Sequence, residues 1–292
     1  MDLPSLFGAA DAHTLELPTG DRAVVAAHGG QLLRWQVEPD HDLLYLSATA
    51  ETDPGAGRAI RGGVPVCWPQ FGERGPLARD GFARLLRWRL HGRDDSSLLM
   101  ELTHEDLPDD WRAAWPHAFQ LRQKIDLAPG QLTLTLDVTN TDAAPWAFSA
   151  ALGSHLAVGD LAQTRLDGLD LPGARMRALA APPEPDGAGL PAQTPLLGGA
   201  IERVYSAPPL DDDEASLERQ LTLRTPARRL TLRQSDSLPE VVLCNPGPRA
   251  ALPGLADGEW ARFLCIAAAA LAPVTLQPGE QWLGWQKITL ER

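Results

Sequence analysis

Residues 119–141 read FQLRQKIDLAPGQLTLTLDVTNT, which is the clearest structural signal in the chain. Apolar and polar side chains alternate in its two arms, QLRQKIDL and QLTLTLDVT, and Ala128-Pro129-Gly130 separates them. Successive side chains of a β-strand point to opposite faces, so the alternation predicts two strands, each with one buried face. Pro-Gly between them is turn chemistry. The stretch therefore predicts an antiparallel hairpin.

The segments on either side of this hairpin carry similar short apolar runs, broken by turn residues at intervals near ten residues, which favours an all-β fold. Only ARFLCIAAAAL, residues 261–271, has an alanine content that favours a helix, and its neighbours argue for a strand. A Pro-, Gly- and Ala-rich stretch at 170–200 is an excursion between strands without a sharp domain break. We expect one domain spanning residues 1–292, since all-β units often reach this size. The other strand-like runs are LEL, AVVAA, QLLRWQV, LLRWRLHGR, SLLMELTHE, WAFSAALGSHLAVGDL, ERVYSAP, QLTLRTPARRLTLRQS, PEVVLCNPGP and PVTLQPGEQWLGWQKITLE.

The composition is that of an acidic folded protein, with a net charge of -12 and 44% hydrophobic residues. This balance argues against nucleic acid or an anionic membrane surface as a partner. Cys67, Cys244 and Cys265 have no close spacing, so neither a disulfide framework nor a zinc site is expected, and no metal is predicted. The first residues, MDLPSLFGAADAH, lack a basic leader pattern, and no apolar run is long enough to span a bilayer. We expect a cytoplasmic protein, monomeric or weakly dimeric.

The stretch IRGGVPVCWPQFGERGPLARDGFAR, residues 60–84, predicts an irregular loop where the sign of the charge reverses. A cleft lined by one sign of charge concentrates ligands of the opposite sign, so an anionic ligand is predicted. If the next strand begins near Arg84, that residue shares the parity of Trp88 and points to the buried side. Arg74, Arg87 and Arg89 are expected on a solvated face. Between residues 61 and 89, two acids, Glu73 and Asp80, face six arginines: Arg61, Arg74, Arg79, Arg84, Arg87 and Arg89.

Eight motifs occur in a fixed order along the chain: HGGQLLRW (28–35), IRGGVPVCWPQFG (60–72), GFAR (81–84), WPHAF (115–119), LTLTLDVTNT (132–141), ERVY (202–205), VVLCNPG (241–247), and FLCIA (263–267) followed by PVTLQPGEQWLGWQ (273–286). Together they resemble the aldose 1-epimerase superfamily, and specifically its hexose-6-phosphate mutarotase (glucose-6-phosphate 1-epimerase-like) branch. The resemblance implies the large antiparallel β-sandwich of galactose-mutarotase-like proteins, with the sugar bound on a concave sheet surface.

The activity that this resemblance implies is the interconversion of the α and β anomers of a sugar phosphate, with no metal or other cofactor. Opening the ring requires an acid that protonates the ring oxygen and a base that removes the proton of the anomeric hydroxyl. Each positioned group is typically worth about 10²–10⁴-fold in rate. In the family the acid is a His and the base a Glu.

The resemblance also assigns residues that bind substrate. Arg61 in IRGG and Arg84 in GFAR match family arginines, and two forked guanidiniums suit a phosphoryl group. Arg79 stands where the family has Gln, and Asp80 stands where its motif His-Gly-Phe-Ala-Arg has His. Glu202 replaces the Asp of Asp-Arg-Val-Tyr. We therefore predict that Arg61, Arg79, Arg84 and Glu202 bind substrate, and that Asp80 is either an ion-pair partner or a catalytic group.

The chain departs from the family at both catalytic positions. Where the family has Ala-Leu-His-Thr-Tyr-Phe this chain has Ala-Leu-Gly-Ser-His-Leu, so Gly153 occupies the position of the acid. Where the family has Cys-Val-Glu this chain has Cys-Ile-Ala, so Ala267 occupies the position of the base. His155 has the strand parity of Gly153 and lies two residues, roughly 6.6 Å, along the strand. It is a candidate substitute acid, or a packing residue where the family places Tyr.

Three functions stay open from the sequence. The first is a mutarotase with an altered acid and base, combining His155 with Asp80 or Glu202. The second is a non-catalytic protein that binds a sugar phosphate through the retained arginines. The third is an interaction scaffold, for which the sequence offers no positive sign.

Overall fold

The computed structural model describes residues 11–38, 41–50, 57–170, 173–180, 190–195, 197–206, 220–249 and 252–291. The described part is built mainly from strands, with one short α-helix, α2 (Asp109–Ala114), and the 3-10 turns η2 (Ala83–Leu85), η3 (His104–Asp106), η4 (Leu161–Gln163) and η5 (Glu259–Arg262). The strands are β1 (Ala12–Glu16), β2 (Arg22–Ala26), β3 (Leu32–Glu38), β4 (His41–Asp42), β5 (Val66–Cys67), β6 (Arg89–Arg93), β7 (Ser97–Thr103), β8 (Phe119–Ala128), β9 (Gln131–Asn140), β10 (Trp146–Ala157), β11 (Arg165–Asp167), β12 (Arg175–Ala178), β13 (Leu190–Pro191), β14 (Ile201–Ser206), β15 (Gln220–Arg224), β16 (Arg229–Gln234), β17 (Glu240–Asn245), β18 (Phe263–Leu276) and β19 (Gln281–Glu291).

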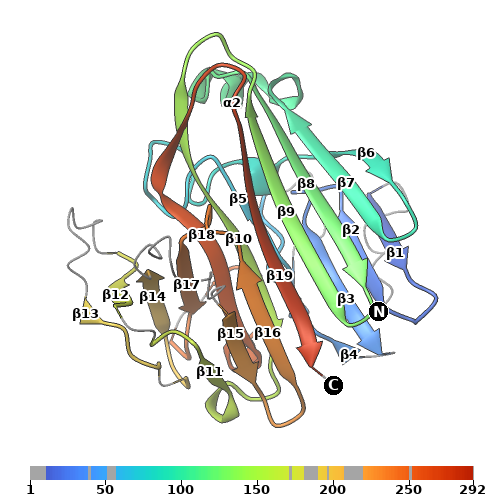
Figure 1. The fold of residues 1–292 in the computed structure, drawn as a ribbon, viewed down its shortest axis with the longest axis vertical. Helices are drawn as coiled ribbons and strands as arrows, with labels where there is room; N and C mark the ends of the chain where they lie inside the picture. The colour runs from blue at the N-terminus through green and yellow to red at the C-terminus, as the bar shows by residue number, and fades with distance from the viewer. Residues whose placement is uncertain are drawn as a thin grey trace, which may run out of the picture.

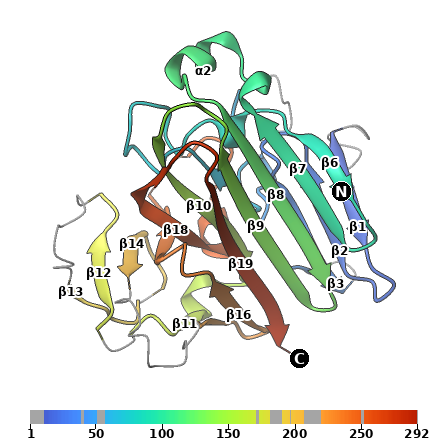
Figure 2. The ribbon, with the colours of Figure 1, turned by 45° about the horizontal axis from the view of Figure 1, so that its top comes forward.

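Within the described ranges these strands form three antiparallel sheets. One has four strands in the order β1-β2-β3-β4, one has seven in the order β13-β12-β14-β17-β18-β10-β5, and one has eight in the order β11-β15-β16-β19-β9-β8-β7-β6. Figures 1 and 2 show β12, β14 and β18 on one side of the molecule and β1–β3 on the other, with β8 and β9 between them. The predicted large antiparallel β-sandwich is confirmed.

The main core lies between the seven- and eight-stranded sheets, and strand parity decides which residues enter it. Leu152 of β10 and Leu134 of β9 are fully buried and belong to one core cluster. The Ser154 hydroxyl donates to Oε1 of Gln286 on β19 at 2.5 Å, which links the two sheets through the core. Gly153 and His155 alternate with these inward residues, so they face the outer side of the seven-stranded sheet.

The hairpin predicted at 119–141 is present as β8 and β9, paired from Phe119–Asn140 to Ala128–Gln131. The alanine-rich run lies in β18, so the strand interpretation is correct. No helix was expected at residues 109–114, where α2 forms. It begins directly after Pro108, a residue tolerated at helix starts, and carries Asp109 and Asp110 in its first turn, where acids favour the helix dipole.

The stretch at 60–84 covers the outer face of the seven-stranded sheet. Its two-residue strand β5 pairs with β10 through Ala151–Cys67 and Leu152–Val66. Isolated bridges Leu32–Val64 and Leu46–Gly62 tie it to the region of the four-stranded sheet. The rest of this stretch is irregular, as predicted, apart from η2 at its end.

Candidate functional site

The floor of the candidate site is a row of four cross-strand neighbours on the outer face of the seven-stranded sheet. Glu202 of β14 pairs with Cys244 of β17, Cys244 pairs with Cys265 of β18, and Cys265 pairs with His155 of β10. All four residues line one cavity of about 170 Å³. The same cavity is lined by the other four predicted site residues, Arg61, Arg79, Asp80 and Arg84.

This row sets the distance between two of the predicted catalytic partners. Adjacent strands lie about 4.8 Å apart, so the three spacings between Glu202 and His155 add up to roughly 14 Å. Side chains stand roughly perpendicular to a sheet and therefore keep this separation. The geometry does not support Glu202 and His155 as an acid and base acting on neighbouring atoms of one sugar ring.

The positions of the family's acid and base lie opposite each other in the next row. Gly153 is the cross-strand partner of Ala267, and both line the same cavity. Residues directly opposite have Cβ atoms about 4.5–5.5 Å apart, so side chains at these two positions converge on one point. The side chains of Gly153 and Ala267 are a hydrogen atom and a methyl group, and neither can act as an acid or a base.

The guanidiniums of Arg61 and Arg84 line the cavity and come from the stretch at 60–84, which covers this face of the sheet. The Nε atoms of Arg61 and Arg84 are buried and have no hydrogen-bond partner among the described residues. The Arg61 Nη2 donates to the Pro253 carbonyl at 3.4 Å, which is a weak contact. Burial and the neighbouring Arg84 lower the pKa of Arg61. Because buried cations need a counter-charge and their N–H groups need acceptors, this pair is suited to an anion.

Arg84 was expected to be buried by the parity of a strand, but that reasoning was wrong. The strand begins at Arg89, and Arg84 lies in η2. Asp80 orients it instead, with Oδ2 3.1 Å from the Arg84 Nη2 and both side chains less than one-fifth exposed. The same Nη2 donates to the Arg79 carbonyl at 2.7 Å.

Asp80 is held in an unusual backbone conformation. Its φ is 62°, in the left-handed region that costs a non-glycine residue about 1–3 kcal/mol. Its Oδ1 accepts from the Gly72 N–H at 2.8 Å, and its own N–H donates to the Gly72 carbonyl at 2.9 Å. Gly81 follows with φ 72°, and a Cβ there would lie 2.1 Å from the Trp68 carbonyl oxygen. Both carboxylate oxygens of Asp80 are engaged, which favours a role in holding the loop and Arg84 over proton transfer.

Gln70 gives the same loop its compact shape. Its amide nitrogen donates to the carbonyls of Leu77 at 3.0 Å and Ala78 at 3.2 Å, and its Oε1 accepts from the Leu77 N–H at 2.9 Å. The Phe71 N–H donates to the Ser149 hydroxyl at 3.0 Å, which fastens the loop to β10. Nothing in the sequence singled out Gln70 for this role.

Trp68 and Phe71 are close to Gln70 in the sequence but have different surroundings. Trp68 is fully buried and contacts several rings, among them Phe82 at 5.5 Å and Phe119 at 4.6 Å between centroids. It is therefore a core residue. Phe71 lines the cavity and packs above the sheet with Ala267.

The hydrogen bonds of His155 determine its tautomer. Its Nδ1 lies 2.9 Å from the Gly153 carbonyl and 3.1 Å from the Gly63 carbonyl. Carbonyl oxygens only accept, so Nδ1 carries the proton and Nε2 carries the lone pair. Burial, with a further contribution from Arg61, lowers the pKa of His155 to about 4. The imidazole is therefore neutral near pH 7, which suits an acceptor or base rather than the predicted acid.

A buried carboxylate, that of Glu259, is linked to His155 through the rings of Tyr45 and Phe263. Glu259 accepts from the Tyr45 hydroxyl at 2.8 Å and the Ser47 hydroxyl at 2.6 Å. Burial opposes ionisation, but these hydrogen bonds lower the pKa of Glu259. The Tyr45 ring stacks on Phe263 at 4.5 Å, and the Phe263 ring lies 5.5 Å from the His155 ring. No local pattern in the sequence indicates this network, because Tyr45 and Ser47 are more than two hundred positions from Glu259.

All three cysteines line the cavity, which their sequence spacing did not predict. The hydrogen bond with the Cys244 thiol and burial raise the pKa of Cys265, and burial raises the pKa of Cys67. Both groups are therefore neutral thiols near pH 7. Within the described ranges, no cluster of three or more His, Cys, Asp or Glu side chains has the geometry to hold a metal ion.

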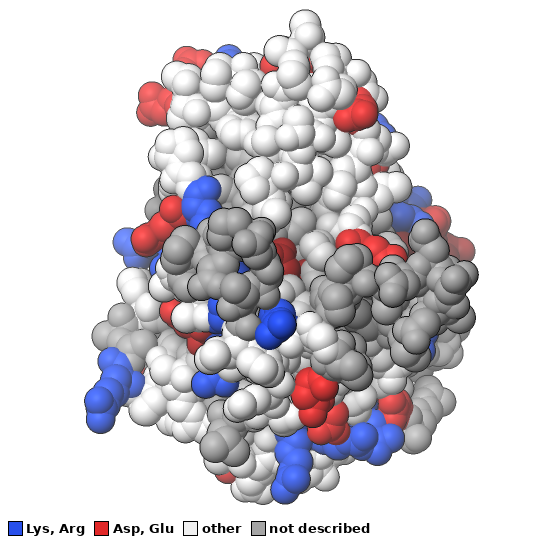
Figure 3. All heavy atoms as spheres, turned by 60° about the vertical axis from the view of Figure 1, so that its left-hand side comes forward, with Lys and Arg blue, Asp and Glu red and all other residues white. Residues whose placement is uncertain are grey.

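Charged groups are mixed over the side of the molecule that carries β12, β14 and β17. Figure 3 shows basic and acidic side chains intermingled over the middle and lower parts of this face, and few charges over its upper part. The face in this view therefore carries no broad basic surface.

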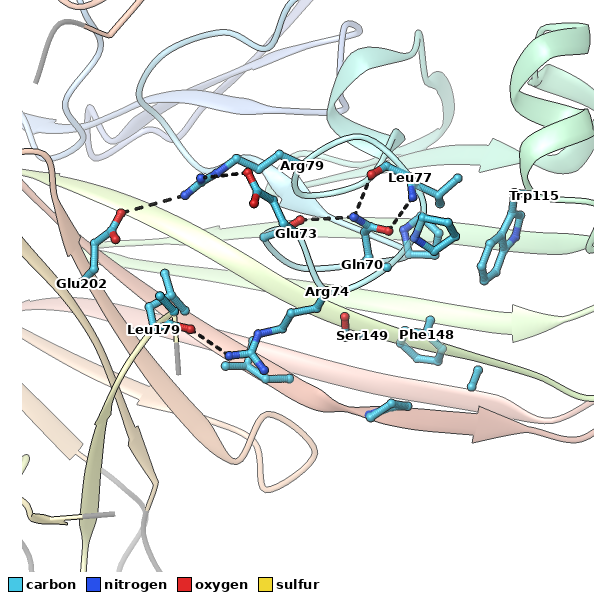
Figure 4. A pocket seen from close by; sticks show the side chains of 18 residues that line it. Gln70, Glu73, Arg74, Leu77, Arg79, Trp115, Phe148, Ser149, Leu179 and Glu202 are labelled. Atoms are coloured by element: carbon cyan, nitrogen blue, oxygen red, sulfur yellow. Dashed lines mark hydrogen bonds and ion pairs between the residues drawn. The ribbon is translucent and has the colours of Figure 1, made fainter. Parts of the chain in front are cut away.

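A second, larger cavity adjoins the first. It has a volume of about 780 Å³ and shares Arg79, Leu179 and Glu202 with the smaller one. Figure 4 shows it extending along the loop from Glu202 to Trp115. Arg74 lines it and donates to the Leu179 carbonyl at 2.9 Å, so the prediction that Arg74 lies on a solvated face was wrong.

The chain is similar to known proteins over most of its length. The sequence profile described as "Aldose 1-epimerase" matches residues 11–289. A protein of Cenchrus ciliaris named "Putative glucose-6-phosphate 1-epimerase" is 30% identical over 279 residues, covering 90% of this chain and 79% of the relative. A Salmonella typhimurium protein of the same name is 34% identical over 152 residues, covering 51% of this chain and 49% of the relative.

The fold is also found in solved structures. The crystal structure of a "putative mutarotase (YeaD)" from Salmonella typhimurium has a TM-score of 0.77 and 26% identity, covering 96% of this chain and 90% of that one. Among the described residues no helix combines the length and the apolar character needed to cross a membrane. The profile match over nearly the whole sequence, together with the Cenchrus relative, shows that this chain belongs to the aldose 1-epimerase family.

Proposed function

We propose that this protein binds a hexose phosphate, with the phosphoryl group between Arg61 and Arg84 and the sugar ring over the row that contains Gly153 and Ala267. The observation that carries the proposal is that the guanidiniums of these two arginines line the cavity and that their buried Nε atoms lack acceptors within the described part of the chain. A phosphoryl group would accept from both guanidiniums and offset their mutual repulsion. The family relatives named for glucose 6-phosphate favour the same ligand class.

Turnover by the family's mechanism is not expected. Gly153 and Ala267 provide no acid or base at the two convergent positions. Asp80 is occupied by Arg84 and Gly72, and Glu202 lies too far along the row to replace the missing base. The protein is proposed to keep the binding chemistry of the family without its pair of proton-transfer groups.

Isothermal calorimetry with glucose 6-phosphate tests this proposal. We expect saturable binding that Arg61→Ala weakens by about 10–100-fold, because a hydrogen bond to a charged group is worth about 1.5–3 kcal/mol. Arg229→Ala is the matched control, since it removes the same charge from an exposed pair between Arg229 on β16 and Glu291 on β19. Absence of binding at millimolar concentration, or equal losses in the two variants, would contradict the proposal.

A second candidate is slow anomer exchange with His155 as the base. The observation that favours it is the neutral imidazole in the cavity wall, whose Nε2 lone pair is available to a sugar hydroxyl. Saturation-transfer NMR between the α and β anomers of glucose 6-phosphate measures this directly. Exchange above the buffer rate that His155→Asn removes would support it, and exchange at the buffer rate at high protein concentration would exclude it.

A further inference from the structure

The larger cavity is the strongest feature that the proposed function does not use. The smaller cavity, at about 170 Å³, is below the 300–1,000 Å³ typical of ligand sites. It adjoins a cavity of about 580 Å³ beside Arg61 and Arg84, and the larger cavity of about 780 Å³ on the side of Leu179. Because the arginines already bind the phosphate, the larger cavity is the one that can receive a second group. The smaller and larger cavities share Arg79, Leu179 and Glu202 in their linings, so they adjoin at these three residues. A ligand confined to the smaller cavity would leave the larger one unfilled.

The wall of the larger cavity combines flat apolar surfaces with polar groups. Trp115 and Leu77 contribute aromatic and aliphatic surface, the buried Phe148 lies in the floor, and Glu73 and Arg79 contribute charged groups. Figure 4 shows Trp115 at the end of the cavity opposite Glu202, with Phe148 between them. A pyranose ring has apolar C–H faces and a rim of hydroxyls, which matches this arrangement of rings and hydrogen-bonding groups.

The junction between the cavities is crossed by a weak contact. The Arg79 and Glu202 side chains are 57% and 59% exposed, and their closest atoms are 3.9 Å apart. Exposed ion pairs at this distance contribute little, so a ligand can replace the contact at small cost. Hydroxyl groups of a bridging sugar would then accept from Arg79 and donate to Glu202.

The residues at the family's acid and base positions, Gly153 and Ala267, also favour a ligand whose phosphorylated hexose is substituted at C1. The missing acid and base act on a free anomeric hydroxyl, and a hexose whose C1 is substituted has none. Both residues line the smaller cavity, so a larger side chain at either position would take up cavity space. The small residues therefore leave room at the sugar for a substituent on C1.

From this geometry, resting on the proposed function, we infer that the natural ligand is a 6-phosphorylated disaccharide, with its phosphorylated hexose in the smaller cavity and its second sugar in the larger one. The arginines hold the phosphate, the Arg79–Glu202 junction contacts hydroxyl groups of the second sugar, and the Trp115 end of the larger cavity receives the rest of that ring.

The test compares trehalose 6-phosphate with glucose 6-phosphate by calorimetry on the full chain. We expect the disaccharide to bind at least about tenfold more tightly, a difference of about 1.4 kcal/mol. Ala180→Trp blocks the larger cavity from an exposed position in its wall and should remove this advantage while leaving glucose 6-phosphate binding unchanged. Ala178→Trp, also exposed but outside the cavity lining, is the matched control and should change neither affinity.

Equal affinities for the two ligands, or a disaccharide advantage that survives Ala180→Trp, would overturn the inference. Tighter binding of an aryl 6-phosphoglucoside than of trehalose 6-phosphate would also overturn the assignment of a second sugar. These failures are distinct from failure of the proposed function, in which glucose 6-phosphate itself does not bind. Thermal unfolding of each variant verifies that the substituted chains remain folded.

Discussion

Gly153→His combined with Ala267→Glu is expected to create rapid anomer exchange on this scaffold. The two positions are direct cross-strand partners facing one cavity, so the new imidazole and carboxylate would flank the same sugar atoms. A Cβ at position 153 would make only ordinary van der Waals contact with Pro65, at 3.5 Å, so the backbone accepts a side chain there. Each restored group is worth about 10²–10⁴-fold, or about 3–5 kcal/mol of barrier.

Because an acid and a base that act as a unit are not additive, the double variant should exceed the parent by at least about 10²-fold, and each single variant should gain much less. Saturation-transfer NMR on glucose 6-phosphate measures the exchange rate, and calorimetry on the same samples measures binding. Gly153→His with Ala267→Gln is the matched control, since it has the same size and lacks the base. If the Glu variant binds the ligand as the parent does yet exchanges anomers no faster than the Gln variant, the assignment of these two positions is wrong.

Three further outcomes follow from the contacts around the site. Lowering the pH from 7 to 5 should destabilise the parent by about 2 kcal/mol more than it destabilises His155→Asn, as measured by urea unfolding. The pKa of His155 is about 4 in the folded state and near 6.5 in the unfolded state, so protonation favours the unfolded chain. The stabilisation by the neutral imidazole is therefore complete above pH 6.5 and is lost as the pH falls toward 4. Similar pH dependence in both proteins would argue against a neutral buried imidazole. Asp80→Ala should lower the free energy of unfolding by about 2–3 kcal/mol, since it removes the acceptor for the Gly72 N–H and the ion-pair partner of Arg84. Asp80→Asn should lower it less, because Asn tolerates the positive φ of this position. Equal losses in the two variants would contradict this role of Asp80. Iodoacetamide should modify the partly exposed Cys244 before the other two thiols, and bound glucose 6-phosphate should slow this reaction. Mass spectrometry measures the modification. If glucose 6-phosphate binds but does not slow the modification of Cys244, the ligand lies elsewhere.

Local patterns were sufficient to predict several elements. Alternation at 119–141 predicted the hairpin β8–β9 because side-chain parity on a strand is a local property, and the turn residues lie within the same stretch. The arginines at 61 and 84 were recognisable because their motifs, IRGG and GFAR, are contiguous. Where the local signal was weak the predictions failed, as for the six-residue α2 and for the solvated position expected for Arg74.

The amino-acid sequence alone therefore established the all-β class, the family resemblance, and the absence of the acid and base at Gly153 and Ala267. The row from Glu202 through Cys244 and Cys265 to His155 became evident only in the folded protein, because it depends on the pairing of strands up to about a hundred positions apart. The tautomer of His155 and the larger cavity beside Arg79 likewise depend on which distant segments cover the sheet. Such long-range registers are fixed by packing of the whole core, and no short stretch of the chain encodes them.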